Sequence, residues 1–246
     1  MEKKIMMTGR KILGLFVILI AVLFASCSVK QEVELSSDGS GTAAMSADID
    51  PMLVTYLQSL AELTGEGGDG NLFDVDEISK GIKENPELEL ISISNKDDMK
   101  IDAEIAFNDI ENLIKQSEEN LNNKKVFSFT EKGKIKEIEI YIDIDNFLDI
   151  APIFPFVEEP LFLTFGPIEN QGLAEDDYLE MMEYALGDGG GQLIKKSMIS
   201  TTINIDGKLI SQSGGEVSGK NSVTFNTPLI RLLLLDEPIH YSIKFE

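Results

Sequence analysis

Several segments of this sequence place an apolar residue at every second position, and this alternation constrains the fold more than any other feature. Between residues 135 and 144 isoleucines alternate with Glu137, Glu139, Tyr141 and Asp143. The segments 99–107, 199–205 and 239–245 show the same pattern. Alternation at a period of two is typical of β-strands with one buried and one wetted side. The chain is therefore expected to build much of its core from strands.

Turn-forming residues pair these strands into hairpins. Val33–Leu35 and Met45–Ile49 flank the turn-forming residues 37–41, which predicts a hairpin near the N-terminus. Leu88–Ile93 is the expected partner of 99–107, and its phase slips between Leu90 and Ile91, which indicates a bulge.

Two further hairpins follow. Val126–Thr130 is expected to pair with Ile135–Ile144. Residues 199–205 run into Asp206-Gly207, the favoured type I′ pair, and are expected to return through residues 208–211.

Helix signals lie between the hairpins. Asp50-Pro51 predicts a helix start, with Asp50 as N-cap. Asp74 and Glu77 form a capping box for a second helix, and Asn108 is the expected cap of a third. Leu179, Met182 and Leu186 predict a helix that ends at Gly187, with a loop to Ser197. This order predicts an α+β fold, with a largely antiparallel sheet of β-hairpins and short helices packed on one face.

The first 26 residues have the three zones of a secretory signal peptide. Lys3, Lys4, Arg10 and Lys11 form a basic region, and an uncharged apolar run follows from Ile12 to Ala25. Fourteen helical residues span about 21 Å, which is short for a hydrocarbon core of roughly 30 Å. A permanent membrane span is the weaker interpretation.

The apolar run ends at Leu23-Phe24-Ala25-Ser26-Cys27, which resembles the lipobox of bacterial lipoproteins, with Phe24 where that family usually has Leu. The resemblance implies cleavage before Cys27 and attachment of acyl chains such as palmitate to it. Cys27 is the chain's single cysteine. An ordinary secretory signal, or an uncleaved anchor, is the alternative.

After such cleavage, residues 27–246 form one extracytoplasmic domain, with a possible subdivision near 151–172. Removing residues 1–26 takes away four basic residues and one acidic residue. The remaining chain has 17 Lys and Arg and 42 Asp and Glu, which gives a formal net charge of −25. Anionic headgroups repel such a body, so the membrane would hold it through its acyl chains. The membrane would be the cell membrane or the outer membrane.

Composition excludes several functions. The excess of acids makes a nucleic-acid partner improbable. One His and one Cys leave no multi-histidine or thiolate metal site, and no cofactor is expected. The GxGxxG at 65–70 follows a helix instead of a strand, which favours a linker. The acidic clusters at 74–77 and 143–149 lack the Gly and Glu of a calcium loop, and His240 falls on the polar phase of its strand.

The N-terminal hairpin with its Asp-Gly-Ser-Gly turn, and the closing strands around Pro228–Pro238, resemble small bacterial lipoproteins of the LppM type. That resemblance implies an α+β lipoprotein domain, with lipid binding suggested for some members.

Residues 151–172 combine four of the eight prolines with a dense apolar sequence. The segment is expected either to wall an apolar cavity or present a docking surface, or to cross the core with one strand over Leu161–Phe165. The candidate binding surface consists of Phe154, Phe156, Leu161, Phe162 and Phe165. We therefore expect a module that binds an apolar ligand or lipid and is not an enzyme. A structural or interaction protein of the envelope is the alternative, and a carboxylate-dependent hydrolase is the third possibility.

Overall fold

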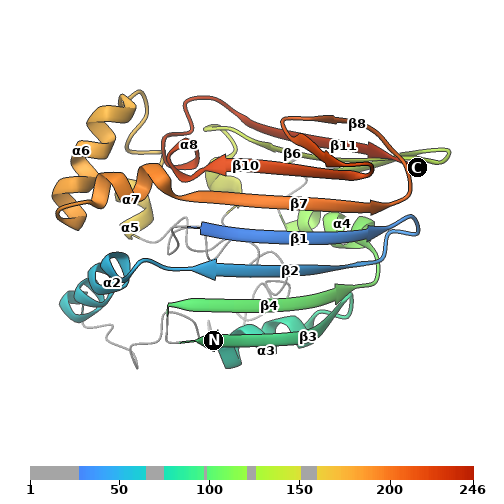
Figure 1. Ribbon diagram of the computed structural model, residues 1–246, viewed down its shortest axis with the longest axis horizontal. Coiled ribbons are helices and arrows are strands. Elements are labelled where there is room, and N and C mark those ends of the chain that lie inside the picture. Colours follow the sequence, from blue (N-terminus) through green and yellow to red (C-terminus); the bar gives the residue numbers. More distant parts are fainter. Residues whose placement is uncertain (1–27, 65–74, 97–98, 121–125, 151–159) are drawn as a thin grey trace, which may run out of the picture.

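The computed structural model describes residues 28–64, 75–96, 99–120, 126–150 and 160–246 (Figure 1). Its strands form two sheets, ordered β3-β4-β2-β1-β7-β10-β9 and β5-β6-β11-β8. The larger sheet contains β1 (Ser28–Ser36), β2 (Gly41–Asp48), β3 (Leu88–Lys96), β4 (Lys100–Phe107), β7 (Met198–Asp206), β9 (Glu216–Gly219) and β10 (Ser222–Pro228). The smaller contains β5 (Phe127–Lys132), β6 (Ile135–Ile142), β8 (Leu209–Ser213) and β11 (Ile239–Phe245). The predicted α+β class with largely antiparallel pairing is confirmed.

The helices lie behind the larger sheet and at one of its ends (Figure 1). Their bounds are α2 (Pro51–Thr64), α3 (Val75–Glu84), α4 (Ile110–Asn120), the 3-10 turn η2 (Phe147–Ile150), α5 (Pro160–Phe165), α6 (Glu175–Leu186), α7 (Gly190–Lys196) and α8 (Leu229–Leu234). In the described part of the chain, no helix is long and apolar enough to cross a membrane.

Three of the predicted hairpins form as expected. β1 and β2 pair antiparallel from Ser28 with Asp48 to Leu35 with Gly41. β3 and β4 pair with a register shift between Leu90 and Ser92, which is the bulge that the phase slip indicated. β5 and β6 form the third pair, and β6 ends at Ile142, two residues earlier than expected.

The fourth predicted hairpin is wrong, because β7 and β8 belong to different sheets. Gly207 does not adopt the positive φ that a type I′ turn needs, so Asp206-Gly207 passes the chain from one sheet to the other. Lys208 then exchanges both backbone hydrogen bonds with Glu246, at 2.8 and 3.1 Å. A Cβ at Gly207 would lie 2.4 Å from the Glu246 carbonyl oxygen, so this crossing requires glycine.

One helix start is confirmed and another differs in detail from the prediction. The Asp50 carboxylate accepts a hydrogen bond from the Met52 amide at 2.8 Å, as an N-cap should. Asp109, not Asn108, caps α4, since its carboxylate accepts from the Glu111 amide at 2.8 Å. The Asn108 side chain instead donates to the Pro86 carbonyl, which leaves the capping role to its neighbour. α3 lies where the capping box placed it, but Asp74 is outside the described residues.

The core lies between the two sheets and the helices. The inward side of β1, β2 and β4 contributes Val29, Leu35, Met45, Ile101 and Phe107, all nearly inaccessible to water. Phe225 of β10 contacts Tyr241 of β11 with ring centroids 4.8 Å apart, so the two sheets pack on each other. Beside that contact, the buried hydroxyls of Thr227 and Tyr241 share a hydrogen bond of 2.7 Å.

Removing the Tyr241 hydroxyl tests this link between the sheets. Tyr241→Phe keeps the ring contact but leaves the buried Thr227 hydroxyl without its partner, which costs about 1 to 2 kcal/mol of unfolding free energy. Tyr184→Phe is the matched control, because that side chain is 94% exposed and should change stability by less than about 0.5 kcal/mol. Urea denaturation measures both, and equal losses would contradict this role of the hydroxyl.

Candidate functional site

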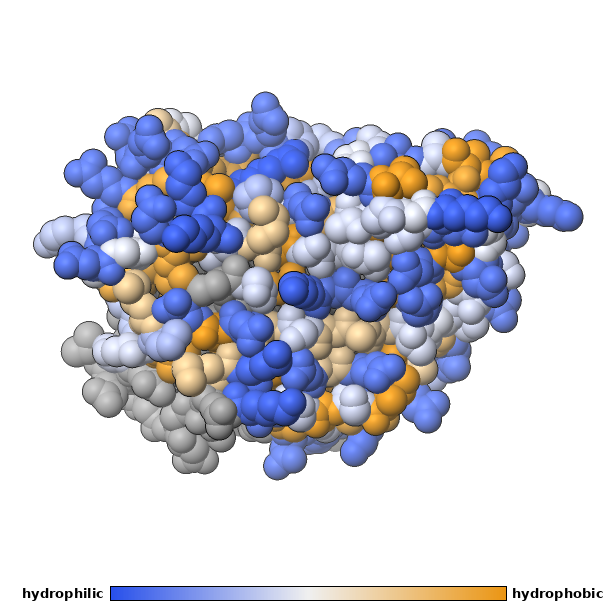
Figure 2. All heavy atoms as spheres, viewed as in Figure 1, coloured by the Kyte–Doolittle hydropathy of each residue, from blue (hydrophilic) through white to orange (hydrophobic). Residues whose placement is uncertain are grey.

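The solvent-facing side of the larger sheet is called here the outer face, and none of the described helices or strands packs over it (Figure 1). Strand register aligns its side chains into rows that cross the sheet. One row runs Ser92, Glu104, Ala44, Glu32, Thr202, Thr224 and Glu216. The next runs Ser94, Asp102, Ser46, Lys30, Ser200 and Asn226. These rows contain only small or polar side chains, and Figure 2 shows hydrophilic and pale residues over most of these strands.

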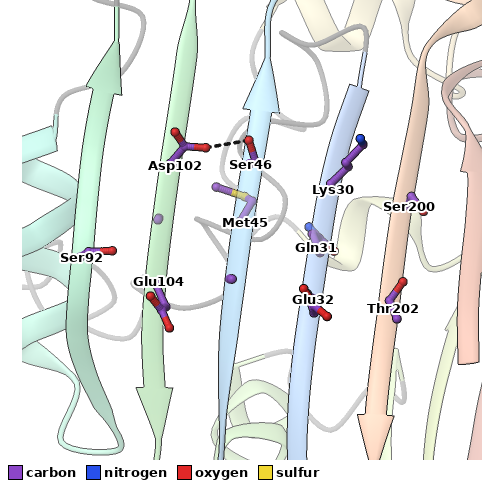
Figure 3. Close-up of a pocket in the computed structure, with 12 residues that line it drawn as sticks. Lys30, Gln31, Glu32, Met45, Ser46, Ser92, Asp102, Glu104, Ser200 and Thr202 are labelled. Atoms are coloured by element: carbon purple, nitrogen blue, oxygen red, sulfur yellow. Dashed lines mark hydrogen bonds between the residues drawn. The ribbon is translucent and has the colours of Figure 1, made fainter. Parts of the chain in front are cut away.

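A hollow of about 450 Å³ opens on this outer face. It is centred on β2, where Ala44 and Ser46 are too small to fill the space between longer side chains of β1 and β4. Glu32 and Glu104 occupy the same row as Ala44, on its two sides (Figure 3). With strands about 4.8 Å apart, the Cα atoms of these two glutamates are separated by about 10 Å.

Several polar groups of the hollow already have partners. The Ser46 hydroxyl donates to Asp102 at 2.7 Å (Figure 3). The side-chain amide of Asn204 donates to Glu32 at 3.1 Å. The hydroxyls of Thr202 and Thr224 are 3.0 Å apart. Lys30 and Glu104 make no hydrogen bond or ion pair with the described residues. The hollow therefore offers one ammonium and one carboxylate to a polar ligand.

No motif in the sequence singled out the outer face. A sequence signal for the hollow does exist in the composition of β2, Gly-Thr-Ala-Ala-Met-Ser-Ala-Asp, in which most side chains are small. The rest of the lining was not readable from the sequence, because β2 also pairs with β4, and β1 pairs with β7, about 170 residues further along the chain.

A second region of interest is the end of the larger sheet where β1 begins, called here the Ser28 end. At this end of the sheet, the strand register places five residues side by side across neighbouring strands: Lys100, Asp48, Ser28, Met198 and Pro228. Helices α5, α6 and α7 lie at the same end (Figure 1). α7 leads directly into Met198, α6 precedes α7, and the Tyr178 hydroxyl of α6 donates to the Phe165 carbonyl of α5 at 2.6 Å. Burial raises the pKa of Tyr178 above its ordinary value, which keeps this donor protonated.

The predicted binding surface is only partly described. Cys27, Phe154 and Phe156 lie outside the described residues, as does the glycine-rich loop at 65–70. Leu161 and Phe162 belong to α5, so the strand expected over Leu161–Phe165 is wrong. Pro160 suits the first position of a helix, because its missing amide proton has no partner there in any case. Phe165 is half-buried and packs against the core.

The loop expected between Gly187 and Ser197 is also a helix. α6 ends at Gly187 as predicted, but α7 follows over Gly190–Lys196. The Glu183 carboxylate accepts from the amides of Gly189 and Gly191, at 2.6 and 2.9 Å. A Cβ at Gly191 would lie 2.5 Å from the Leu179 carbonyl oxygen. The glycines thus permit the close approach of α7 to α6, and Glu183 satisfies the free amides at its start.

Asp143 of the acidic cluster at 143–149 and His240 have structural partners. The Asp143 carboxylate accepts from the Asn146 amide at 2.9 Å, and its hydrogen bond with the Tyr141 hydroxyl raises the pKa of Tyr141. His240 is exposed, as predicted, and lies 2.7 Å from Glu139. Among the described residues, no group of three or more His, Cys, Asp or Glu side chains is placed to hold a metal ion.

A scan against protein-family models and a search of the curated proteins found no match. Among solved structures, the NMR structure of the folded domain of the Mycobacterium tuberculosis LppM protein is similar to this chain. The identity is 12% and the TM-score is 0.42, over 90% of this chain and 91% of that chain. The likeness is weak.

Glu183 should make the α6–α7 pair sensitive to acid. The amides of Gly189 and Gly191 lower the pKa of Glu183 below its ordinary 4.5, so its contribution to stability is present above that pH. The contribution is lost as the pH falls from 4.5 through the lowered value. We expect Glu183→Gln to reduce stability at neutral pH and to flatten the pH dependence below 4.5. Thermal unfolding between pH 3 and 7 measures this, with the exposed Glu180→Gln as control, and identical profiles for the two variants would exclude it.

Proposed function

We propose that this protein is a bacterial lipoprotein, anchored through acyl chains on Cys27, whose body binds an apolar ligand and catalyses no reaction. The observation that supports this proposal is the position of Ser28. Ser28 begins β1 at the centre of the larger sheet and is joined directly to Cys27. The anchor would therefore attach to the folded body without a linker.

The position of α5 favours an apolar ligand drawn from the membrane. α5 is part of the apolar segment that begins at Ala151. The hydrogen bond from the Tyr178 hydroxyl of α6 to the Phe165 carbonyl fixes α5 at the Ser28 end. An anchor on Cys27 would keep that same end beside the bilayer. A lipid could then pass between the bilayer and a surface containing Phe154, Phe156, Leu161, Phe162 and Phe165 over a short distance.

The alternative is an interaction protein of the cell envelope, and the outer face is the observation that favours it. Seven strands present small and polar side chains to solvent, with a hollow at the centre. A flat polar surface of this kind suits a protein partner or a polar ligand better than a lipid. A carboxylate hydrolase has less support, because Glu32 and Asp102 are each held by a neighbouring side chain.

The anchor is tested in the producing bacterium. Globomycin, which blocks cleavage at lipoboxes, should cause the uncleaved precursor to accumulate, and Cys27→Ser should abolish labelling by radioactive palmitate. Immunoblotting and autoradiography measure these two effects. A precursor that is processed normally in the presence of the inhibitor would rule out the lipoprotein assignment.

The ligand is tested by native mass spectrometry of the body, residues 28–246, purified without detergent. We expect a stoichiometric apolar ligand that is lost in Phe156→Asp and Phe162→Asp, because a buried carboxylate is strongly unfavourable beside an acyl chain. Tyr184→Asp, at a 94% exposed position of α6, should retain the ligand. Circular dichroism checks that each variant is folded. An empty, folded body would shift the assignment to the interaction protein, and pull-downs from envelope extracts would follow.

A further inference from the structure

β1 is fixed in place from its first residue. Ser28 pairs with Asp48 of β2 on one side and with Met198 of β7 on the other. Moving Ser28 away from the body would therefore break the centre of the larger sheet. Consecutive Cα atoms are about 3.8 Å apart, so an acylated Cys27 brings the Ser28 end to the headgroup layer.

We propose that the body docks end-on against the bilayer, with the Ser28 end in contact with lipid headgroups. This inference rests on the proposed anchor at Cys27, and it adds a defined orientation. β1 runs away from the membrane, and its nine residues rise about 3.3 Å each, so the far end of the sheet is about 26 Å further out. The occupant of the Ser28 end is the lipid surface itself.

The Ser28 end carries both paired and unpaired acids. Three of the acids described there have lysine partners, Lys100 with Asp48 at 3.7 Å, Lys96 with Asp102 at 3.8 Å and Lys195 with Glu175 at 3.4 Å. Asp176, Asp177 and Glu180 of α6 are exposed and form no ion pair with the described residues. Asp50 caps α2. Asp97 and Asp98, in the β3–β4 connection, lie outside the described residues.

Two lysines at this end remain available. Lys30 and Lys196 are exposed and form no ion pair with the described residues. Their long side chains can extend from the protein surface towards lipid phosphates, and anionic lipids attract such cations. The Met99 side chain, 38% exposed beside Lys100, supplies an apolar contact at the same edge.

The test uses the full-length, processed chain in vesicles of phosphatidylethanolamine and phosphatidylglycerol. Acylation would consume the Cys27 thiol, so a single introduced cysteine would carry the only reactive thiol. Met99→Cys labels the Ser28 end, and Asp206→Cys labels the exposed far end of β7. Each is coupled to a nitrobenzoxadiazole fluorophore and quenched with aqueous iodide, and each quenching constant is divided by its value in urea.

We expect the normalised quenching constant to be several-fold smaller at position 99 than at position 206. Equal constants, or a smaller constant at 206, would overturn end-on docking. Flotation of the vesicles separates this result from failure of the anchor. A chain that floats with equal constants contradicts the docking alone, whereas a chain that does not float contradicts the anchor and the docking together.

Charge reversal tests the role of the lysines. Lys30→Glu with Lys196→Glu should raise iodide access at position 99, because the two glutamates would be repelled by phosphatidylglycerol. Lys132→Glu with Lys134→Glu, at the β5–β6 turn near the far end, is the matched control and should leave access unchanged. Equal access in both double variants would show that the lysines do not contribute to the docked state.

Discussion

The larger sheet depends on the pairing of β1 with β7. β1 is antiparallel to β2 and parallel to β7, whose residues follow about 170 positions later. This is the parallel pair in an otherwise antiparallel sheet, and it joins the N-terminal hairpins to the C-terminal third of the chain. Closing so long a loop costs conformational entropy before any contact offsets it, so we expect the central pairing to be slower to form than the local hairpins.

The pairing also determines which surfaces are free. Strands cross between the sheets at Asp206–Lys208, at Gly214-Gly215 and through α8, so the smaller sheet packs on the inward side of the larger one. The outer face is left to solvent, and its small and polar rows follow from that exposure. The core and the candidate polar surface are therefore two sides of the same seven strands.

Local chemistry was enough to predict the elements whose partners are close in sequence. The phase slip at Ile91 and the Asp50 cap both depend on residues within a few positions, and both are present. Two of the errors involve partners that lie beyond these few positions. Asp206-Gly207 has the sequence of a tight hairpin, but Glu246 takes the hydrogen bonds of Lys208. The glycines before α7 have the sequence of a loop, but Glu183 caps them from the preceding helix.

The candidate sites divide in the same way. The anchor at Cys27 is a prediction from a local pattern, the lipobox resemblance, and the apolar composition of 151–172 is visible without any structure. The hollow is not, because Glu32 and Glu104 are 72 positions apart and become neighbours across Ala44 only through two strand registers. The proposed orientation of the body rests on both kinds of information. The lipobox resemblance predicts an anchor at Cys27, and the register places Ser28 at the centre of the larger sheet. An acylated Cys27 would therefore give the whole body a fixed direction relative to the membrane.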